Sequence, residues 1–418
     1  MPYVILAAVF ALLAQLAAYG FATVPEGVAL AACDQLAKGA DFFSQDWGAA
    51  SVCALMLKPV YLAAFALNGG ADGIFYLMRI IALGIDFALA LVAYRILSRS
   101  VDAAKALWTS LLFLACATVL SRLGDPFGLA TACAFASLLC AWETYLDALT
   151  DDGEATGYLR VFKPLLCGVF AISALAFSTV VGVLVIVALA TVLVVALRAR
   201  GASLLSTAWV ACGAFLAIAV YLIIAMGYGD PGAVFAAIGR GLAAGLAPSS
   251  GLAIAGAAIG FLGVGVFVAS YLADALAAAA KLELALRIVG TALAVAACCI
   301  SLCLMMLPAM QGGEHVGNGP AQELNVAGED AAVYGDALDI SDKVSDSQPV
   351  FIAGDDAQWA YLLLSGKRDD VAAQWLLLPA DVDENTAELD LANCGQIAAN
   401  DSFQLYKRAS AIGSISQA

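Results

Sequence analysis

The sequence contains little charge and only one histidine. Of its 418 residues, 13% are charged and 63% are hydrophobic, whereas soluble domains are about one quarter charged. The eleven cysteines show no CxxC or Cys/His spacing and the single histidine is His315, which argues against a zinc or haem centre. Because the apolar runs are continuous rather than alternating, a closed transmembrane barrel is excluded as well. These features predict an α-helical polytopic membrane protein.

The hydrophobic runs predict about nine transmembrane helices, since a helix needs about 20 apolar residues to cross a bilayer. The candidate spans are residues 1–22, 74–97, 105–121, 126–142, 165–179, 181–197, 205–226, 250–273 and 286–308. The pair 165–179 and 181–197 also fits one long helix followed by a re-entrant piece. Residues 50–67 are apolar too, but Lys58-Pro59 interrupts them, so we expect an interfacial helix there.

The basic residues predict the orientation. With the N-terminus in the cytoplasm, nine Lys and Arg fall in inner loops, and the short outer loops hold only Lys38, Lys58, Arg122 and Arg240. Inner loops of membrane proteins normally carry this excess. The first apolar run has no basic start and no clear cleavage site, so we expect it to stay as the first helix. The sequence shows no organelle signal, which suits a bacterial plasma membrane.

The C-terminal part is acidic, with 18 Asp and Glu against 5 Lys and Arg from residue 309 onward. This acidity argues against nucleic-acid binding, which needs a basic surface. The chain is predicted to divide into a transmembrane domain, a linker and a soluble extracytoplasmic α/β domain, at residues 1–308, 309–344 and 345–418. In the last of these, 348–354 and parts of 388–408 have strand character, and 356–367 has helical spacing.

Polar chemistry gathers in the first predicted outer loop, residues 23–73. Its acidic residues are Glu26, Asp34, Asp41, Asp46 and Asp72. Long structured loops between spans are usually functional. Acids at a membrane surface can act as a general base, a metal ligand or a trap for cations. The alternative for any single acid is that it solvates the loop or caps a helix.

The pattern PEGVALAACDQLAKGADFFSQDWG, followed by LMLKPVYLAAFAL and GIFYLMR, resembles the start of the GT-C glycosyltransferases. This family includes the protein O-mannosyltransferases and the lipid A aminoarabinose transferases. The likeness is detailed over residues 20–100 and extends beyond them only as topology. The matching positions are Gly39, Asp41, Asp46, Trp47, Pro59, Gly73, Ile74 and Arg79. Two departures stand out: the family's Asp-Glu pair reads Pro25-Glu26 here, and an additional residue separates Gly39 from Asp41.

The resemblance implies an enzyme that transfers a sugar from a polyprenyl-phosphate carrier in the lipid membrane to an acceptor at the outer face. An outer-loop carboxylate would be the general base, and the candidates are Asp41, Asp46 and Glu26. Substrate-binding candidates are Trp47, Lys58, Arg79, Arg122, Asp125 and Arg240. For Arg122 and Arg240 the alternative is a helix-end anchor at lipid headgroups, and for Asp125 a turn or helix cap. No cofactor is implied, and a divalent metal stays open.

Two other functions remain open on the sequence. The Pro25-Glu26 departure keeps a non-catalytic cell-envelope protein with a GT-C-like fold under consideration. A transporter would place polar or broken helices at mid-bilayer. Only Arg79 and Asp86 lie deep in a predicted span, seven residues apart and on one helix face. They either line a substrate cleft or hold helices together, since intramembrane charges usually face the protein interior.

Overall fold

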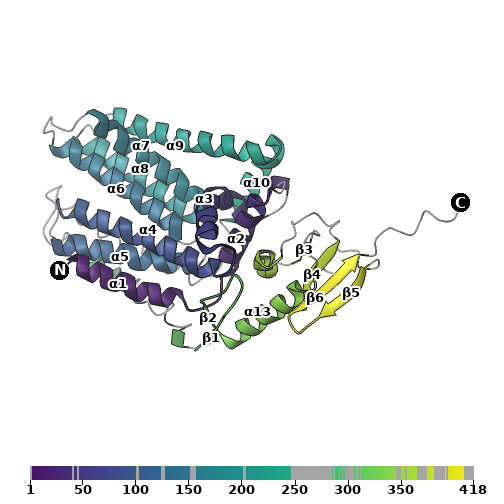
Figure 1. The fold of residues 1–418 in the computed structure, drawn as a ribbon. Helices are drawn as coiled ribbons and strands as arrows, with labels where there is room; N and C mark the ends of the chain where they lie inside the picture. The colour runs from purple at the N-terminus through teal and green to yellow at the C-terminus, as the bar shows by residue number, and fades with distance from the viewer. Residues whose placement is uncertain are drawn as a thin grey trace. The chain divides into compact units, whose positions relative to one another are not determined.

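The computed structural model describes most of the chain in two compact units (Figure 1). The described residues are 2–39, 42–44, 47–99, 103–123, 128–150, 157–200, 204–245, 312–344, 350–353, 355–364, 374–380 and 394–408, with single positions at 391 and within 285–310. The first unit, the helical unit, comprises Met1–Ala17, Arg79–Ile224 and Leu242–Met310. The second, the mixed unit, comprises Ala18–Met78, Ala225–Gly241 and Gln311–Ala418.

The helical unit is built from long apolar helices whose positions agree with the predicted spans. Their bounds are α1 (Pro2–Ala17), α4 (Ile74–Leu97), α5 (Ala103–Leu123), α6 (Leu129–Thr150), α7 (Gly157–Phe177), α8 (Thr179–Arg200) and α9 (Leu204–Ala225), with the first turn of α4 and the last residue of α9 in the mixed unit. Helix α4 has the predicted bounds, whereas α7 begins earlier than predicted and contains Pro164.

Two apolar clusters hold the helical unit together. One joins α1, α4 and α5 through large side chains such as Leu13, Leu83 and Phe113. The other joins α6, α7 and α8, which lie side by side (Figure 1), through small residues such as Ala134 and Ala171. Small side chains allow membrane helices to approach closely, which compensates for the weak hydrophobic drive between helices in lipid.

Helices α7 and α8 form a hairpin of two separate helices. Ser178 is the one residue between them that is not helical. A β-carbon placed on Gly182 would meet the backbone of Leu175, so the two helices are in direct contact at the turn. Of the two interpretations of this segment, the structure therefore supports two helices rather than one long helix with a re-entrant piece.

The chain is an α-helical polytopic membrane protein with a small C-terminal sheet. Among the described residues, three helices are long and apolar enough to cross a membrane, namely Ala50–Asn68, Ile74–Leu97 and Leu205–Tyr228. The first of these is the helix expected at the interface, and half of its most apolar window is buried inside the protein. The predicted span 250–273 lies outside the described residues and 286–308 almost entirely so. The number of nine spans stays a prediction.

The mixed unit combines the first loop region with the C-terminal part of the chain. Its helices are α2 (Val24–Ala37), η1 (Phe42–Ser44), α3 (Ala50–Asn68), η3 (Met226–Tyr228), α10 (Pro231–Ala244, whose last residues belong to the helical unit), α13 (Gly328–Ser341) and η4 (Asp355–Leu362). Its strands are β1 (Glu314–His315), β2 (Asn325–Val326), β3 (Val350–Ile352), β4 (Trp375–Pro379), β5 (Cys394–Ala399) and β6 (Phe403–Arg408). The last four form one sheet in the order β3-β4-β6-β5, in which only β3 and β4 are parallel.

The segment predicted as a linker, 309–344, has a different organisation in the structure. It contains the β1–β2 pair and helix α13. The amide of Asn325 donates to the carbonyl of Ala18 at 2.7 Å, and the amide of Gly73 donates to that of Gly319 at 2.9 Å. Its Gly- and Asn-rich composition resembles a linker, but backbone partners distant in sequence satisfy its polar groups. The first loop and the C-terminal fold therefore belong to one unit.

Candidate functional site

Helix α2 carries the first acid of the loop, Glu26, in a helix cap. The side chain of Thr23 accepts from the amide of Glu26 at 3.4 Å, and the Glu26 carboxylate accepts from the amide of Thr23 at 3.3 Å. This reciprocal capping box satisfies two amides that the first turn leaves unpaired, and Pro25 suits the first turn because its nitrogen has no proton to donate. Glu26 is only 2% exposed. Its geometry is that of a structural cap.

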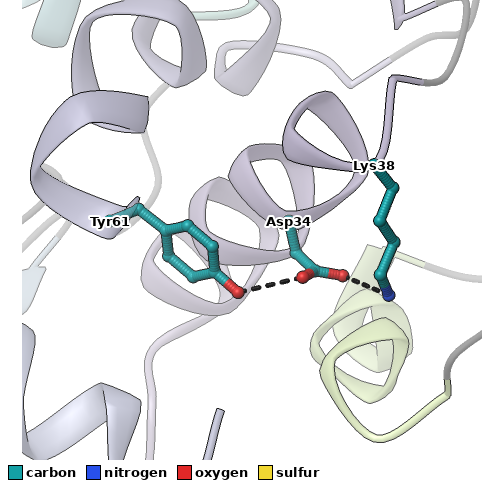
Figure 2. A network of polar contacts seen from close by, with 3 residues as sticks. All are labelled: Asp34, Lys38 and Tyr61. Carbon is teal, nitrogen blue, oxygen red and sulfur yellow. Dashed lines mark hydrogen bonds and ion pairs between the residues drawn. The ribbon is translucent and has the colours of Figure 1, made fainter. Parts of the chain in front are cut away.

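At the other end of α2, the carboxylate of Asp34 makes two polar contacts (Figure 2). One oxygen, Oδ1, accepts from the hydroxyl of Tyr61 on α3 at 3.0 Å, and the other, Oδ2, lies 2.7 Å from the ammonium of Lys38. Both Asp34 and Tyr61 are buried. Removing a carboxylate from water is costly unless charged and hydrogen-bonded partners compensate, and here both kinds are present.

Lys58 adds a second cation at the same end of α2. Its ammonium donates to the carbonyl of Leu36 at 3.1 Å and to the hydroxyl of Tyr228 at 2.9 Å. The nitrogen also lies 4.6 Å from the centre of the Tyr228 ring. Lys58 thus brings α2, α3 and η3 together. Lys58 contacts the same end of α2 at which Asp34 and Lys38 pair, and we call these three charged residues the Lys58 cluster.

Asp34 is one of the acids of the first loop, but the sequence did not predict it as a site residue. The spacing of Asp34 and Lys38, four residues apart, is a recognisable helical ion pair. The pairing with Tyr61 crosses 27 positions and has no local signal. Next to Asp34, burial raises the pKa of the Cys33 thiol well above its ordinary value. Cys33 and Cys53 are both free thiols.

The loop that follows α2 begins at Gly39, whose φ of 73° lies in the left-handed region that glycine adopts without strain. It ends at Trp47, which is 2% exposed. The Trp47 ring stacks on Phe42 at 6.0 Å and meets the ring of Tyr361 in η4 edge-on at 5.9 Å. Trp47, a predicted substrate contact, is therefore a buried anchor for the loop. The two preferred acids, Asp41 and Asp46, lie outside the described residues.

A second aromatic cluster joins the C-terminal fold to the residue Phe21 before α2, and its Trp359 also lies against Gly27 in the first half of α2. The ring of Trp359 in η4 meets Phe21 edge-on at 5.0 Å and stacks on Tyr334 at 5.6 Å. The hydroxyl of Tyr334 donates to the carbonyl of Asn318 at 3.0 Å. Both halves of α2 are therefore fixed, one against η4 and the other against α3.

Four predicted substrate contacts lie elsewhere in the sequence, and the structure describes two of them fully. Arg79 is 8% exposed and donates to the carbonyl of Ala17, at the end of α1, at 3.1 Å. This contact supports the alternative in which Arg79 holds helices together. Arg240 is exposed on α10. The side chain of Arg122 and the whole of Asp125 lie outside the described residues.

Within the described ranges, no three His, Cys, Asp or Glu residues gather closely enough to hold a metal ion. The chemistry that the Lys58 cluster offers is that of an ammonium held by a backbone carbonyl and a tyrosine hydroxyl. Such an arrangement can stabilise negative charge on a phosphate.

Comparisons with known proteins gave similarity in fold only. Neither a protein-family model nor a curated protein matches the sequence. Two solved structures of ArnT from Cupriavidus metallidurans are similar to the chain. The structure bound to undecaprenyl phosphate is 13% identical, with 98% of each chain covered and a TM-score of 0.47. The apo structure is 16% identical, with 96% of this chain and 97% of that chain covered and a TM-score of 0.44.

Proposed function

We propose that the chain is a membrane glycosyltransferase that moves a sugar from a polyprenyl-phosphate carrier to an acceptor at the outer membrane face. The resemblance over residues 20–100 supplies the reaction class. The observation that carries the proposal is the ammonium of Lys58, held by the carbonyl of Leu36 and the hydroxyl of Tyr228. Leu36 lies three residues before the loop that contains Asp41 and Asp46.

The proposed reaction needs one base and one cation. The carboxylate of Asp41 takes the proton of the acceptor hydroxyl as its oxygen forms a bond to the anomeric carbon. The bond between that carbon and the phosphate oxygen breaks, and its electron pair leaves with the polyprenyl phosphate. The ammonium of Lys58 stabilises the charge that builds on the phosphate, since lysine is a compact point charge suited to phosphate.

The other predicted residues take supporting roles in this proposal. Asp46 orients the acceptor or a divalent metal ion. Arg240 is the proposed second cation, because it is exposed on α10, which begins three residues after Tyr228 of η3. Arg122 and Asp125 remain proposed substrate contacts. Glu26 acts through its helix cap and sets where α2 begins.

A second candidate is a non-catalytic membrane protein with the same fold. The observation that favours it is the capping box of Glu26. The family's Asp-Glu pair reads Pro25-Glu26 here, and the remaining acid is occupied at 3.3 Å by the amide of Thr23. Such a protein would bind the lipid carrier without transferring its sugar.

Transfer assays with purified protein separate the two candidates. Wild type is expected to transfer sugar from a polyprenyl-phosphate donor, and Asp41→Asn to lose roughly 10²–10⁴ in rate, as is typical when a general base is removed. The matched control is Asp72→Asn, an exposed acid in the same loop region. If wild type transfers and both Asp41→Asn and Asp46→Asn match it, the loop is not catalytic. If wild type binds polyprenyl phosphate but transfers nothing, the non-catalytic candidate is favoured.

A further inference from the structure

We propose that Asp34 and Tyr61 are positioning residues that hold the ammonium of Lys58 in place. This inference rests on the proposed function and deepens it. The two carboxylate oxygens of Asp34 have separate partners, Tyr61 on α3 and Lys38 at the end of α2 (Figure 2). A single buried side chain therefore fixes both a neighbouring helix and the residue from which the acidic loop departs.

The connection from Tyr61 to Lys58 runs along one face of α3. Residues three apart on a helix lie on the same face, so the side chain of Tyr61 stands one turn beyond that of Lys58. Each of them bonds to α2, Tyr61 to Asp34 at 3.0 Å and Lys58 to the carbonyl of Leu36 at 3.1 Å. Two neighbouring bonds between the same two helices fix the rotation of α3 about its axis. That rotation decides where the Lys58 ammonium points.

Pro59 makes this external support necessary. It lies inside α3, directly after Lys58. Proline has no amide proton, so it removes a hydrogen bond from the helix and its ring disturbs the preceding turn. The turn that carries Lys58 is therefore the weakest part of α3, and bonds to α2 on either side of Pro59 replace what the helix itself lacks.

A structural role alone does not account for a carboxylate at this place. Burying a charged pair contributes little net stability, because the loss of hydration offsets the attraction. Apolar side chains would join α2 and α3 at least as firmly, because they pay no such loss of hydration. The effect particular to Asp34 is directional, since its hydrogen bond and ion pair each fix a defined geometry.

A double-mutant cycle tests the proposal. The four proteins are wild type, Tyr61→Phe, Lys58→Met and the double variant. Displacing a reacting group by about 1 Å can lower the rate about 10²-fold, so Tyr61→Phe is expected to lower kcat by about that factor while KM changes less. In the Lys58→Met background the same substitution should have no further effect, because the group that it positions is gone.

The outcomes separate positioning from structure. If Tyr61→Phe lowers kcat equally in both backgrounds, or leaves it unchanged in the wild-type background, the proposal is overturned. Tyr94→Phe, at a buried tyrosine of the helical unit, is the matched control and should leave kcat unchanged. If Tyr61→Phe does not fold, Asp34→Ala takes its place in the cycle, because it removes the oxygen that accepts from the hydroxyl of Tyr61.

Failure of the proposed function can be distinguished from failure of this inference. If wild type transfers no sugar, the same four proteins are compared by their dissociation constants for polyprenyl phosphate. If Tyr61→Phe weakens the affinity in the wild-type background and has no effect on it in the Lys58→Met background, the positioning role is supported even without transfer. Equal losses in both backgrounds, or no loss in the wild-type background, overturn the positioning role independently of catalysis.

Discussion

Trp359 lies directly against Gly27. A β-carbon placed on Gly27 would come within 2.8 Å of the β-carbon of Trp359, closer than side chains normally approach. The 3-10 helix η4 can therefore contact the first half of α2 only because position 27 has no side chain. This contact joins the C-terminal fold to the first loop region, which the sequence separates by most of its length.

We expect Gly27→Ala to destabilise the mixed unit. The added methyl group overlaps the backbone end of Trp359, and overpacking of this kind typically costs about 1–3 kcal/mol. A lower melting temperature in detergent would show it. The matched control is Gly335→Ala in α13, where a β-carbon meets nothing within 4 Å. Alanine is the better helix former, so this control should be neutral or slightly stabilising. Equal melting temperatures for the two variants would contradict the close contact.

In the helical unit, a substitution of Gly168 on α7 should likewise destabilise the protein, because this residue lies against α9. A β-carbon there would overlap the backbone oxygen of Val210, and one on Gly213 would overlap the backbone oxygen of Leu165. Because backbone atoms cannot move aside as a flexible side chain can, Gly168→Ala is expected to reduce the yield of folded protein and its melting temperature. Gly84→Ala in α4 is the control, with open space around its β-carbon. A stable Gly168→Ala protein would rule out the close packing of α7 and α9.

Arg79 is expected to matter for stability rather than for substrate binding. Its guanidinium satisfies the carbonyl of Ala17, and losing the partner of a buried polar group costs about 1–3 kcal/mol. Arg79→Met should therefore lower the melting temperature, whereas Arg95→Met, at an exposed position of the same helix, should not. A variant that keeps its stability but no longer binds polyprenyl phosphate would return Arg79 to the substrate site.

Tyr334 should make the protein sensitive to alkali. Burial raises the pKa of Tyr334 to about 12, whereas a tyrosine in an unfolded chain ionises near 10. The unfolded state thus loses its proton first, so this contribution to stability is complete below pH 10 and disappears as the pH rises to 12. Tyr334→Phe should be less stable at neutral pH but lose less stability between pH 10 and 12. The measurement is the melting temperature of both proteins as a function of pH. An equal fall in melting temperature for wild type and variant between pH 10 and 12 would disprove this.

The orientation of the chain can be tested by labelling single cysteines. The division of basic residues predicts the N-terminus inside and the C-terminal part outside. In a background without other cysteines, an impermeant reagent added to whole cells should label Ser345→Cys and should not label Ser203→Cys. Permeabilised cells serve as the control, in which both positions should react. The reverse pattern would refute the predicted topology.

Local patterns predicted much of this fold. Continuous apolar runs predicted the helices of the helical unit, with α4 at the bounds that the structure has. The strand character of 348–354 and of parts of 388–408 predicted β3, β5 and β6. The run WLLLP of β4 was missed, because a short apolar stretch buried on both faces has no period to recognise. The segment 356–367 was predicted as a helix, and the structure has a 3-10 helix over Asp355–Leu362.

The site was harder to predict, because its contacts join distant positions. Trp47 is a residue type that is common at membrane interfaces, but here it is buried against Tyr361 of the C-terminal fold. Lys58 was proposed from the family resemblance of the stretch around Lys58-Pro59, whereas its contact with Tyr228 spans 170 positions. No period or spacing in the sequence encodes such pairs. They depend on tertiary packing, which only the folded chain supplies.

The contact between Gly27 and Trp359 also determines when the first loop region can finish folding. More than three hundred residues separate the two positions. A ribosome adds roughly 5–20 residues per second, so α2 waits roughly 20–60 s for the segment that covers it. During that interval its glycine face is bare and Phe21 has no indole ring beside it. Maturation of the proposed active region therefore waits for the synthesis of η4, although most of its polar residues precede η4 by more than a hundred positions.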